Sequence, residues 1–349
     1  MRKIKIGSFN VGHDYPCFII AEAGVNHNGD LNIAKELVKQ AKLSGADCVK
    51  FQTFKAERLI TKNAPKADYQ NKTTDPRESQ FDMLKKIELP KEMHLELIQY
   101  CNELDILFMS TAYNVEDVDF LDELEVDAFK LASISAAEPS FVKYTAKKNK
   151  PIILSTGMAT MSEIDEAVRA CRDVENLDLI LLQCTTNYPS KSEDSNILAM
   201  DTIKKAFEIE VGYSDHTKSD ISCIAAVALG AKVIEKHFTI DKSLPGPDHS
   251  SSLTPDEFKR LVKNIRETEQ CLGSRIKTPT DIEIINSIGM RRSIVVKKPI
   301  KKGIMITEDF LTFKRPADGI KPSMIDYFLG KKANKDLEIN DRINFSDIS

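Results

Sequence analysis

Val211-Gly-Tyr-Ser-Asp-His216 and Val233-Ile-Glu-Lys-His-Phe-Thr239 are two short apolar runs, each leading into carboxylate and imidazole groups. An Ala-rich segment of about helical length separates them, so residues 211–239 have the order strand, helix, strand. In barrel enzymes the carboxyl ends of the strands carry the chemistry. Imidazoles on neighbouring strand ends, here His216 and His237, could bind one divalent metal ion. Two histidines without a third ligand also fit ordinary hydrogen-bonded strand ends, and these residues alone leave both interpretations open.

The same alternation of strand and helix extends in both directions from this stretch. Strands are expected at Phe18–Gly24, Cys48–Phe54, Leu107–Thr111, Ala128–Ser133, Pro151–Thr156, Leu179–Thr185, Glu210–His216 and Lys232–Thr239. Helical spacing of apolar residues falls near 31–43, 79–86, 91–103, 115–124, 138–148, 162–174, 196–207, 219–229 and 255–270. This alternation predicts an α/β fold, a (β/α)8 TIM barrel. The first turn, Gly24 to Gly29, lacks the GxGxxG pattern of dinucleotide-binding sheets.

Two segments interrupt the regular pattern. A polar insert covers residues 56–78, and a loop of that length inside a compact domain is usually an active-site lid or disordered. After Gly273 the helical pattern stops. We therefore expect a catalytic barrel over residues 1–275, a linker over 276–290, and a small, mostly β, basic domain over 291–349. The lysines at 297, 298, 301 and 302 are expected to form a solvated rim.

Composition excludes several classes of function. A chain of 349 residues suits a barrel of about 250 residues with a small appendage. The net charge of −4 gives no general basic field for nucleic acid. No apolar run approaches the ~20 residues that span a bilayer, and no signal-peptide core is present, so we expect a soluble, cytoplasmic protein. Seven cysteines without a CxxC pair are expected to be reduced core residues.

Polar groups gather where the predicted strands end. They are Glu22, Lys50, Gln52, Ser110, Thr111, Lys130, Ser133, Ser155, Thr156, Thr185, Thr186, Ser214, His216, Glu235 and His237. Two lysines and a ring of hydroxyls at one mouth would suit a phosphate or carboxylate ligand. Each lysine could instead be a salt-bridge partner of Glu22 or Glu235. The stiff loop Pro245-Gly-Pro-Asp-His249 either offers Asp248 to the same mouth or is a plain turn.

Seven ordered motifs resemble the sialic acid synthase family over essentially the whole chain. They are Glu22-Ala-Gly-Val-Asn-His-Asn-Gly29, Val49-Lys-Phe-Gln-Thr-Phe54, Ser155-Thr-Gly-Met158, Gly212-Tyr-Ser-Asp-His216, Glu235-Lys-His-Phe-Thr239, Gly246-Pro-Asp-His249 and Lys314-Arg-Pro316. The resemblance implies a barrel enzyme that condenses phosphoenolpyruvate with an N-acylated mannosamine-type sugar. It also implies a carboxyl-terminal SAF domain, similar to type III antifreeze proteins.

The resemblance assigns roles to individual residues. His216 and His237 would hold a divalent metal, Mn²⁺ or Mg²⁺, that polarises the sugar aldehyde, with Glu22 beside it. The phosphoenolpyruvate-binding set would be Lys50, Thr111, Lys130, Ser133, Ser155 and Ser214. The sugar would face Gln52, Tyr188 and Asp248, and Arg315 would reach it from the other subunit of a domain-swapped homodimer.

The implied reaction needs no Schiff base. Carbon 3 of phosphoenolpyruvate attacks the aldehyde, water adds at carbon 2, and phosphate leaves with cleavage of the C–O bond. The lysines then act as charge partners and not as nucleophiles. A Schiff-base aldolase using Lys130 or Lys50 is the competing enzyme hypothesis, and trapping with borohydride and pyruvate would distinguish it.

The chain departs from the family pattern at two places. Ser133-Ile134-Ser135 stands where most relatives have Ser-Gly-Glu, which removes a carboxylate facing the sugar, and Ser110-Thr-Ala-Tyr113 stands where they have Ser-Thr-Pro-Phe. The substrate could thus be N-acetylmannosamine or 2,4-diacetamido-2,4,6-trideoxymannose, the latter giving a legionaminic acid synthase. A family member of altered specificity or reduced activity, which mainly binds a sugar or a partner, is the third hypothesis.

Overall fold

The computed structural model describes residues 2–75 and 77–349, leaving aside the side chains of residues 68, 69 and 72. Contacts divide the chain into two compact units, Met1–Gly273 and Ser274–Ser349. None of the helices described in either unit is long and apolar enough for a membrane span.

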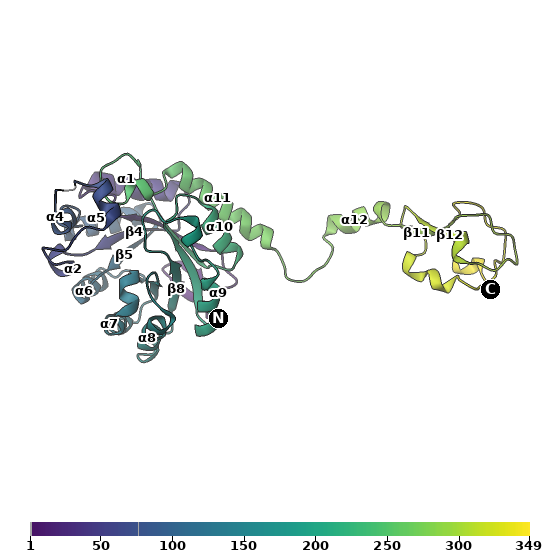
Figure 1. Cartoon of the computed structure of the whole chain (residues 1–349), viewed down its shortest axis with the longest axis horizontal. Coiled ribbons are helices and arrows are strands. Elements are labelled where there is room, and N and C mark those ends of the chain that lie inside the picture. Colours follow the sequence, from purple (N-terminus) through teal and green to yellow (C-terminus); the bar gives the residue numbers. More distant parts are fainter. Residues whose placement is uncertain (1, 76) are drawn as a thin grey trace. The chain divides into compact units, whose positions relative to one another are not determined.

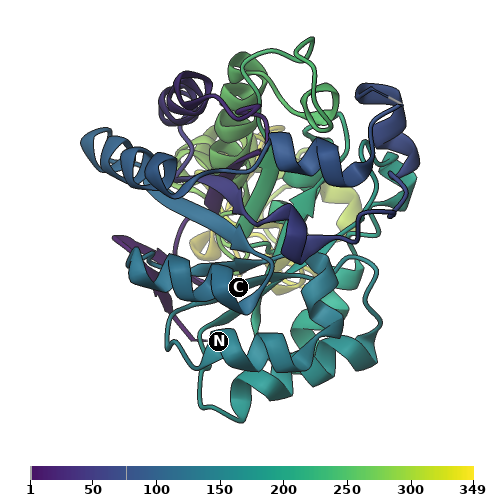
Figure 2. The same cartoon turned by 90° about the vertical axis from the view of Figure 1, so that its left-hand side faces the viewer.

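The first unit is a closed barrel of eight parallel strands, ringed by helices (Figures 1 and 2). Its strands are β3 (Phe18–Gly24), β4 (Cys48–Thr53), β5 (Leu107–Ala112), β6 (Phe129–Leu131), β7 (Ile152–Ser155), β8 (Leu179–Cys184), β9 (Glu210–Asp215) and β10 (Val233–His237). The helices that follow them are α1 (Leu31–Leu43), α5 (Lys91–Glu103), α6 (Val115–Glu123), α7 (Pro139–Ala146), α8 (Met161–Arg172), α9 (Ala199–Phe207), α10 (Ile221–Ala228) and α11 (Pro255–Leu272). The predicted TIM barrel is confirmed.

The barrel interior changes from apolar to polar along each strand. Ile20, Met109, Ile153 and Val233 belong to one buried apolar cluster inside the barrel. Ile4, Ile6 and Val11 of the hairpin β1 (Ile4–Ile6) and β2 (Phe9–Val11) join that cluster. Two residues further along each strand, the period of two places Glu22, Thr111, Ser155 and Glu235 on the same interior face. The carboxyl half of the barrel is therefore polar although every strand residue named here is buried.

Gly212 shows how tightly this interior is filled. A Cβ atom at this position of β9 would lie 2.4 Å from the carbonyl oxygen of Val233 and 2.6 Å from Leu182 Cδ2. A side chain there would displace the apolar layer on which the polar layer rests. Glycine is the residue that allows this close approach of neighbouring strands.

Several predicted strands are shorter than expected, Ala128–Ser133 and Lys232–Thr239 by three residues each, and the polar insert is partly helical. Ser133 does not continue β6 but begins a 3-10 helix, Ser133–Ala137, so the strand expected at Ala128–Ser133 was drawn too long. The insert contains α2 (Ala56–Leu59) and α3 (Asp68–Thr73), and α4 (Gln80–Lys86) follows it. Other 3-10 helices are Ser192–Asp194 and His249–Ser251.

The second unit has its own small core around Ile294, Val296, Leu311 and Phe328. Antiparallel strands β11 (Ser293–Val296) and β12 (Leu311–Lys314) pair there, and 3-10 helices lie at Glu308–Phe310, Pro322–Tyr327 and Phe345–Asp347. Helix α12 (Asp281–Met290) lies within residues 276–290, the segment expected to be a linker. Thr280 caps this helix, because its hydroxyl accepts from the Glu283 amide while the Glu283 carboxylate accepts from the Thr280 amide.

Candidate active site

Strand register brings the charged residues of the polar layer together. Glu22 on β3 lies opposite Lys50 on β4, and Ser214 on β9 lies opposite Glu235 on β10. Lys50 Nζ is 2.9 Å from Glu22 Oε2 and 3.3 Å from Glu235 Oε2, and it donates to Thr111 Oγ1 at 2.9 Å. The salt-bridge interpretation of Lys50 is therefore realised in the structure, in the same group of residues that was expected to bind an anion.

Lys130 approaches the Glu235 carboxylate at its other oxygen. Its Nζ donates to Ser155 Oγ at 2.8 Å and to the Leu131 carbonyl at 3.0 Å, and it is 3.7 Å from Glu235 Oε1. Ser214 Oγ donates to that Glu235 oxygen at 2.9 Å. Two lysines and three hydroxyls thus surround one buried carboxylate, and we call these residues with Glu22 the ionic cluster.

Burial and neighbouring charges move the pKa values of this cluster apart. Burial would raise the pKa of Glu235, but Lys130 and Lys50 outweigh it and lower the pKa to about 2. Burial, aided by the charge of Glu235, raises the pKa of Glu22 even beside Lys50. Burial also lowers the pKa of Lys130. Glu235 is therefore the permanent anion of the pair, and Glu22 is the carboxyl group that can hold a proton.

Ser133 contacts the backbone of the segment that follows β7. Its Oγ accepts a hydrogen bond from the Gly157 amide at 3.0 Å. A Cβ atom on Gly157 would lie 2.5 Å from Thr186 Oγ1 and 2.9 Å from Ser133 Oγ, so this close approach requires glycine. All six residues expected to bind phosphoenolpyruvate therefore lie at the polar end of one barrel.

The two histidines lie side by side at the ends of β9 and β10. Their ring centroids are 5.3 Å apart, and the Tyr188 ring lies 4.1 Å from His216 and 5.5 Å from His237. His216 Nδ1 donates to the Thr185 carbonyl at 2.6 Å, which leaves Nε2 with its lone pair. His237 Nδ1 is buried and has no hydrogen-bond partner among the described residues, and burial lowers the pKa of this imidazole well below its usual range.

These features fit a metal held by two imidazoles. Both rings are within reach of one ion, since metal bonds to ring nitrogen are about 2.0–2.2 Å long. Burial favours the neutral, metal-binding form of His237, whereas Cys184 and the Thr185 carbonyl outweigh burial and raise the pKa of His216. Across residues 2–75 and 77–349, no group of three or more His, Cys, Asp or Glu side chains is arranged to hold a metal ion. An ion on His216 and His237 would therefore complete its coordination with water or substrate.

A buried ion pair fixes both histidine-bearing strands from outside the barrel. Lys236 Nζ donates to Asp215 Oδ2 at 2.5 Å and to the Ser219 carbonyl at 2.9 Å, and both charged side chains are fully buried. Asp215 also accepts from the Thr217 amide and from Ser222 Oγ. Lys236 precedes His237 and Asp215 precedes His216, so this pair supports the imidazoles without facing the site.

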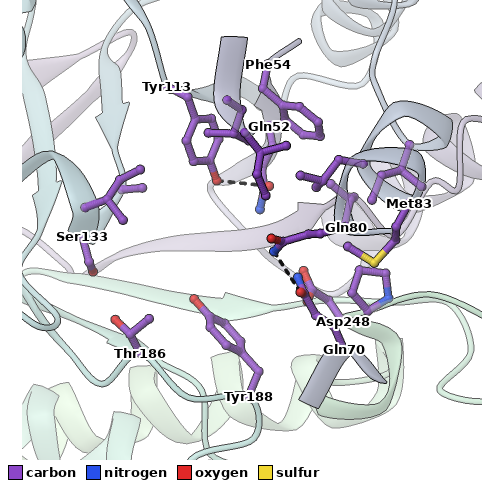
Figure 3. Close-up of a pocket in the computed structure, with 18 of the residues that line it drawn as sticks. Gln52, Phe54, Gln70, Gln80, Met83, Tyr113, Ser133, Thr186, Tyr188 and Asp248 are labelled. Atoms are coloured by element: carbon purple, nitrogen blue, oxygen red, sulfur yellow. Dashed lines mark hydrogen bonds between the residues drawn. The ribbon is translucent and has the colours of Figure 1, made fainter. Parts of the chain in front are cut away.

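A cavity of about 360 Å³ adjoins the histidines (Figure 3). Gln52, Tyr188 and Asp248, the residues expected to face the sugar, line it together with Ser133 and His237. Gln52 is oriented at both ends, because Nε2 donates to Glu22 Oε1 at 3.1 Å and Oε1 accepts from Tyr113 at 3.2 Å. Asp248 Oδ2 lies 3.8 Å from His237 Nδ1, and burial raises the pKa of Asp248 to about 7.

Two residues singled out in the sequence lie elsewhere. Arg315 belongs to the second unit, where it is exposed after β12. Ser135 is fully buried and its Oγ has no partner in the described part of the chain, while the neighbouring Ile134 lines the cavity. Ser135, which stands where most relatives have the carboxylate, is thus buried, whereas Ile134 forms part of the cavity wall.

Sequence reasoning missed the part of the cavity that the insert and α4 provide. Leu59, Ile60, Gln70, Gln80, Met83, Leu84 and Ile87 all line it. The helical spacing at 79–86 was visible in the sequence, but nothing there indicated which face of that helix meets the barrel mouth.

Comparison with known proteins agrees with this architecture. Residues 37–277 match the NeuB family, and residues 291–349 match the SAF domain. The chain is 48% identical to N,N'-diacetyllegionaminic acid synthase of Campylobacter jejuni, covering 93% of this chain and 98% of that protein. It is 45% identical to the protein of the same name from Legionella pneumophila, covering 93% of each.

A solved structure supports the same assignment. The N-acetylneuraminic acid (sialic acid) synthetase of Leptospira borgpetersenii superposes with a TM-score of 0.74 at 33% identity, over 82% of this chain and 95% of that one. The resemblance drawn from the seven motifs is confirmed. The chain belongs to the NeuB family and carries a carboxyl-terminal SAF domain.

Proposed function

We propose that this protein is a nonulosonic acid synthase that condenses phosphoenolpyruvate with 2,4-diacetamido-2,4,6-trideoxymannose, as an N,N'-diacetyllegionaminic acid synthase does. Support for the sugar comes from the two relatives with that name, which the chain matches at 48% and 45% identity over nearly their whole length. N-acetylmannosamine is the alternative sugar.

The observation that carries the proposal is the meeting of two different sites in one barrel mouth. The ionic cluster offers two ammonium groups and several hydroxyls, which suit the phosphate and carboxylate of phosphoenolpyruvate. The imidazole pair adjoins it, as does the cavity, which is lined mostly by uncharged side chains. Such a mouth holds an anion and a neutral polyol next to each other, as a condensation requires.

The residues of the chain then have distinct tasks. Lys50 and Lys130 neutralise the bound anion, while Glu235 keeps both lysines in place. Glu22 has a raised pKa, so it is suited to give a proton to the aldehyde oxygen when the carbon–carbon bond forms. Water adds at carbon 2 of the former enol phosphate, the C–O bond to phosphate breaks, and inorganic phosphate leaves.

His216 and His237 would hold the divalent metal, which we propose to be Mn²⁺ or Mg²⁺. When bound, such an ion supplies a Lewis acid for the aldehyde oxygen. The imidazoles themselves would contribute the nitrogen ligands, with the Thr185 carbonyl orienting His216 and the Tyr188 ring contacting both.

We also propose that the enzyme is a homodimer in which Arg315 serves the other subunit. The support is helix α12, whose Ile282, Ile284, Ile285 and Ile288 side chains are each more than half exposed. Four isoleucines on one short helix form the kind of apolar surface that a second copy of the chain would cover.

Phosphate release tests the proposed function. After treatment with EDTA, the enzyme is supplied with phosphoenolpyruvate and the diacetamido sugar, and Mn²⁺ or Mg²⁺ is then added back. We expect release only when the sugar and the metal are both present. Release that survives chelation, or that proceeds without sugar, would contradict the proposal.

A further inference from the structure

The end of the cavity farthest from Ser133 is built by the segment Leu59–Ile87. Figure 3 shows Ser133 and Thr186 on one side of the cavity, and Gln70, Gln80 and Met83 on the other. Val25 and Phe54, which directly follow β3 and β4, lie beside this end. We call it the distal subsite, because the ionic cluster lies at the opposite side with Ser133.

Two glutamine amides in the distal subsite are locked against each other. Gln80 Nε2 donates to Gln70 Oε1 at 3.0 Å, and that oxygen also accepts from the Ala67 amide at 3.0 Å. With its oxygen occupied twice, buried Gln70 turns its amide nitrogen away from these donors. Among the side chains that the structure describes, none donates to Gln80 Oε1 or accepts from Gln70 Nε2.

This pair therefore keeps the NH2 group of Gln70 as a donor and the carbonyl oxygen of Gln80 as an acceptor. An acetamido group presents the complementary set, a carbonyl oxygen and an N–H, held in one plane. A hydroxyl group at the same carbon is shorter by several atoms and reaches fewer of these partners. An amide left without partners penalises the ligand that cannot reach it, and the penalty is larger at Gln70, which is buried, than at half-buried Gln80.

The rest of the distal subsite is apolar. Leu59, Ile60, Met83, Leu84 and Ile87 line it, and we call them the apolar wall. Leu59, Leu84 and Ile87 also pack with Val25 and Phe54 in one hydrophobic cluster, which holds the wall against the barrel. A methyl group gains by contact with such a wall, whereas a hydroxyl placed there loses its bonds to water.

We propose that the distal subsite selects the sugar, with Gln70 and Gln80 binding its 4-acetamido group and the apolar wall contacting its 6-methyl group. This inference rests on the proposed function, which places the aldehyde carbon beside the imidazoles. Carbons 4 to 6 then extend away from the ionic cluster, toward the glutamine pair and the wall. The segment Leu59–Ile87 is thereby the specificity element of the enzyme.

Four mannose derivatives separate the two contacts in kinetic assays. All four carry an acetamido group at carbon 2. Carbon 4 bears either an acetamido or a hydroxyl group, and carbon 6 is either a methyl group or a CH2OH group. For Gln80→Met we expect kcat/KM to fall about tenfold with both 4-acetamido sugars and to change little with both 4-hydroxy sugars. For Ile60→Thr, a smaller and more polar β-branched replacement, we expect a loss of severalfold that follows the 6-methyl group and not the substituent at carbon 4.

Two controls accompany these assays. They are the KM for phosphoenolpyruvate and the variant Gln99→Met. Gln99 lies on α5, exposed, and its amide donates to Glu103, so its replacement should leave all four sugars unchanged. An equal loss with every sugar, or no loss, in Gln80→Met would overturn the proposal. A wild-type enzyme that prefers 4-hydroxy sugars would overturn this inference and the proposed choice of sugar but not the condensation itself, whereas one that condenses none of the four would overturn the proposed function as a whole.

Discussion

Lys130 is the residue at which anion binding can be separated from structural support. Its ammonium group touches Ser155 and approaches Glu235, which Lys50 also neutralises, so Glu235 keeps one partner when Lys130 is replaced. We expect Lys130→Gln to raise the KM for phosphoenolpyruvate about tenfold, which corresponds to ~1.4 kcal/mol of binding. The KM for the sugar should stay within a factor of about two.

Steady-state kinetics with each substrate varied in turn measures this difference. Lys143→Gln is the matched control, since Lys143 lies on α7 and pairs with Asp173 at the surface. A parallel rise of both KM values in Lys130→Gln would show that the lysine supports the barrel mouth as a whole.

At the scale of elements, the β9–β10 pair depends on the buried contact between Asp215 and Lys236. Lys236→Met leaves the Asp215 carboxylate buried without its cation, and the free energy of unfolding should fall by about 3–5 kcal/mol. Adding Asp215→Asn removes the orphaned charge, so the double variant should recover part of that loss.

Urea unfolding monitored by circular dichroism measures these differences. Lys205→Met is the control, because its pair with Asp201 is exposed on α9 and should be worth less than about 1 kcal/mol. A double variant as unstable as Lys236→Met would show that the ion pair itself is not the source of the stability.

Helix α5 packs on the barrel through His94, which makes stability depend on pH. His94 Nδ1 donates to the Pro90 carbonyl at 2.9 Å, and Nε2 accepts from Thr53 Oγ1 at 2.8 Å. Burial lowers the pKa of His94 from 6.5 to about 4. Between these two values the unfolded chain binds more protons than the folded one, so stability falls as the pH falls.

His94 alone should account for about 3 kcal/mol between neutral pH and pH 4. His94→Gln should therefore flatten the decline of the unfolding free energy over this range, while Gln99→Met, at an exposed position on the same helix, should leave it unchanged. Denaturant titrations at a series of pH values give the slopes. Identical slopes for His94→Gln and the wild type would contradict the role of His94.

The order of these elements could be predicted, but their exterior partners could not. The barrel strands are continuous apolar runs that end in polar residues, and this pattern identified Glu22, Lys50 and His237 as residues of one mouth. Lys236 has no such signature, since a lysine between Glu235 and His237 gives no sign that it is fully buried against Asp215.

The distal subsite and α12 show a second limit of prediction. Gln70 and Gln80 are ordinary polar residues in a polar insert, and only tertiary packing brings their amides together. Helix α12 lies in a segment expected to be a linker because residues 274–290 show little strand character, and its helical form was not predicted. The local sequence predicts an element well when that element buries its own apolar face. The distal subsite and α12 depend instead on contacts that the local sequence does not specify.

At the scale of the whole molecule, the proposed dimer makes each site depend on two chains. His237→Asn removes a ligand in the barrel, and Arg315→Ala removes a group of the second unit. Each variant should be inactive or nearly so by itself. Mixed and refolded together, the two should regain activity, because some dimers then combine an intact barrel with the partner's intact arginine.

Complementation is measured as phosphate release after mixing, with sedimentation to establish the oligomeric state. Ile285→Lys on α12 should weaken the dimer and abolish complementation, whereas the exposed Leu177→Lys on the barrel should not. Activity of monomeric enzyme at full rate would contradict the shared site.

The most direct test of the central claim follows the bridging oxygen of phosphoenolpyruvate. Enzyme with Mn²⁺ is incubated with 2,4-diacetamido-2,4,6-trideoxymannose and phosphoenolpyruvate labelled with ¹⁸O at that oxygen. The masses of both products are then measured by mass spectrometry. The account predicts one condensed nonulosonic acid without label and inorganic phosphate that carries it. Label retained in the sugar acid, or labelled phosphate without a condensed product, would contradict the account.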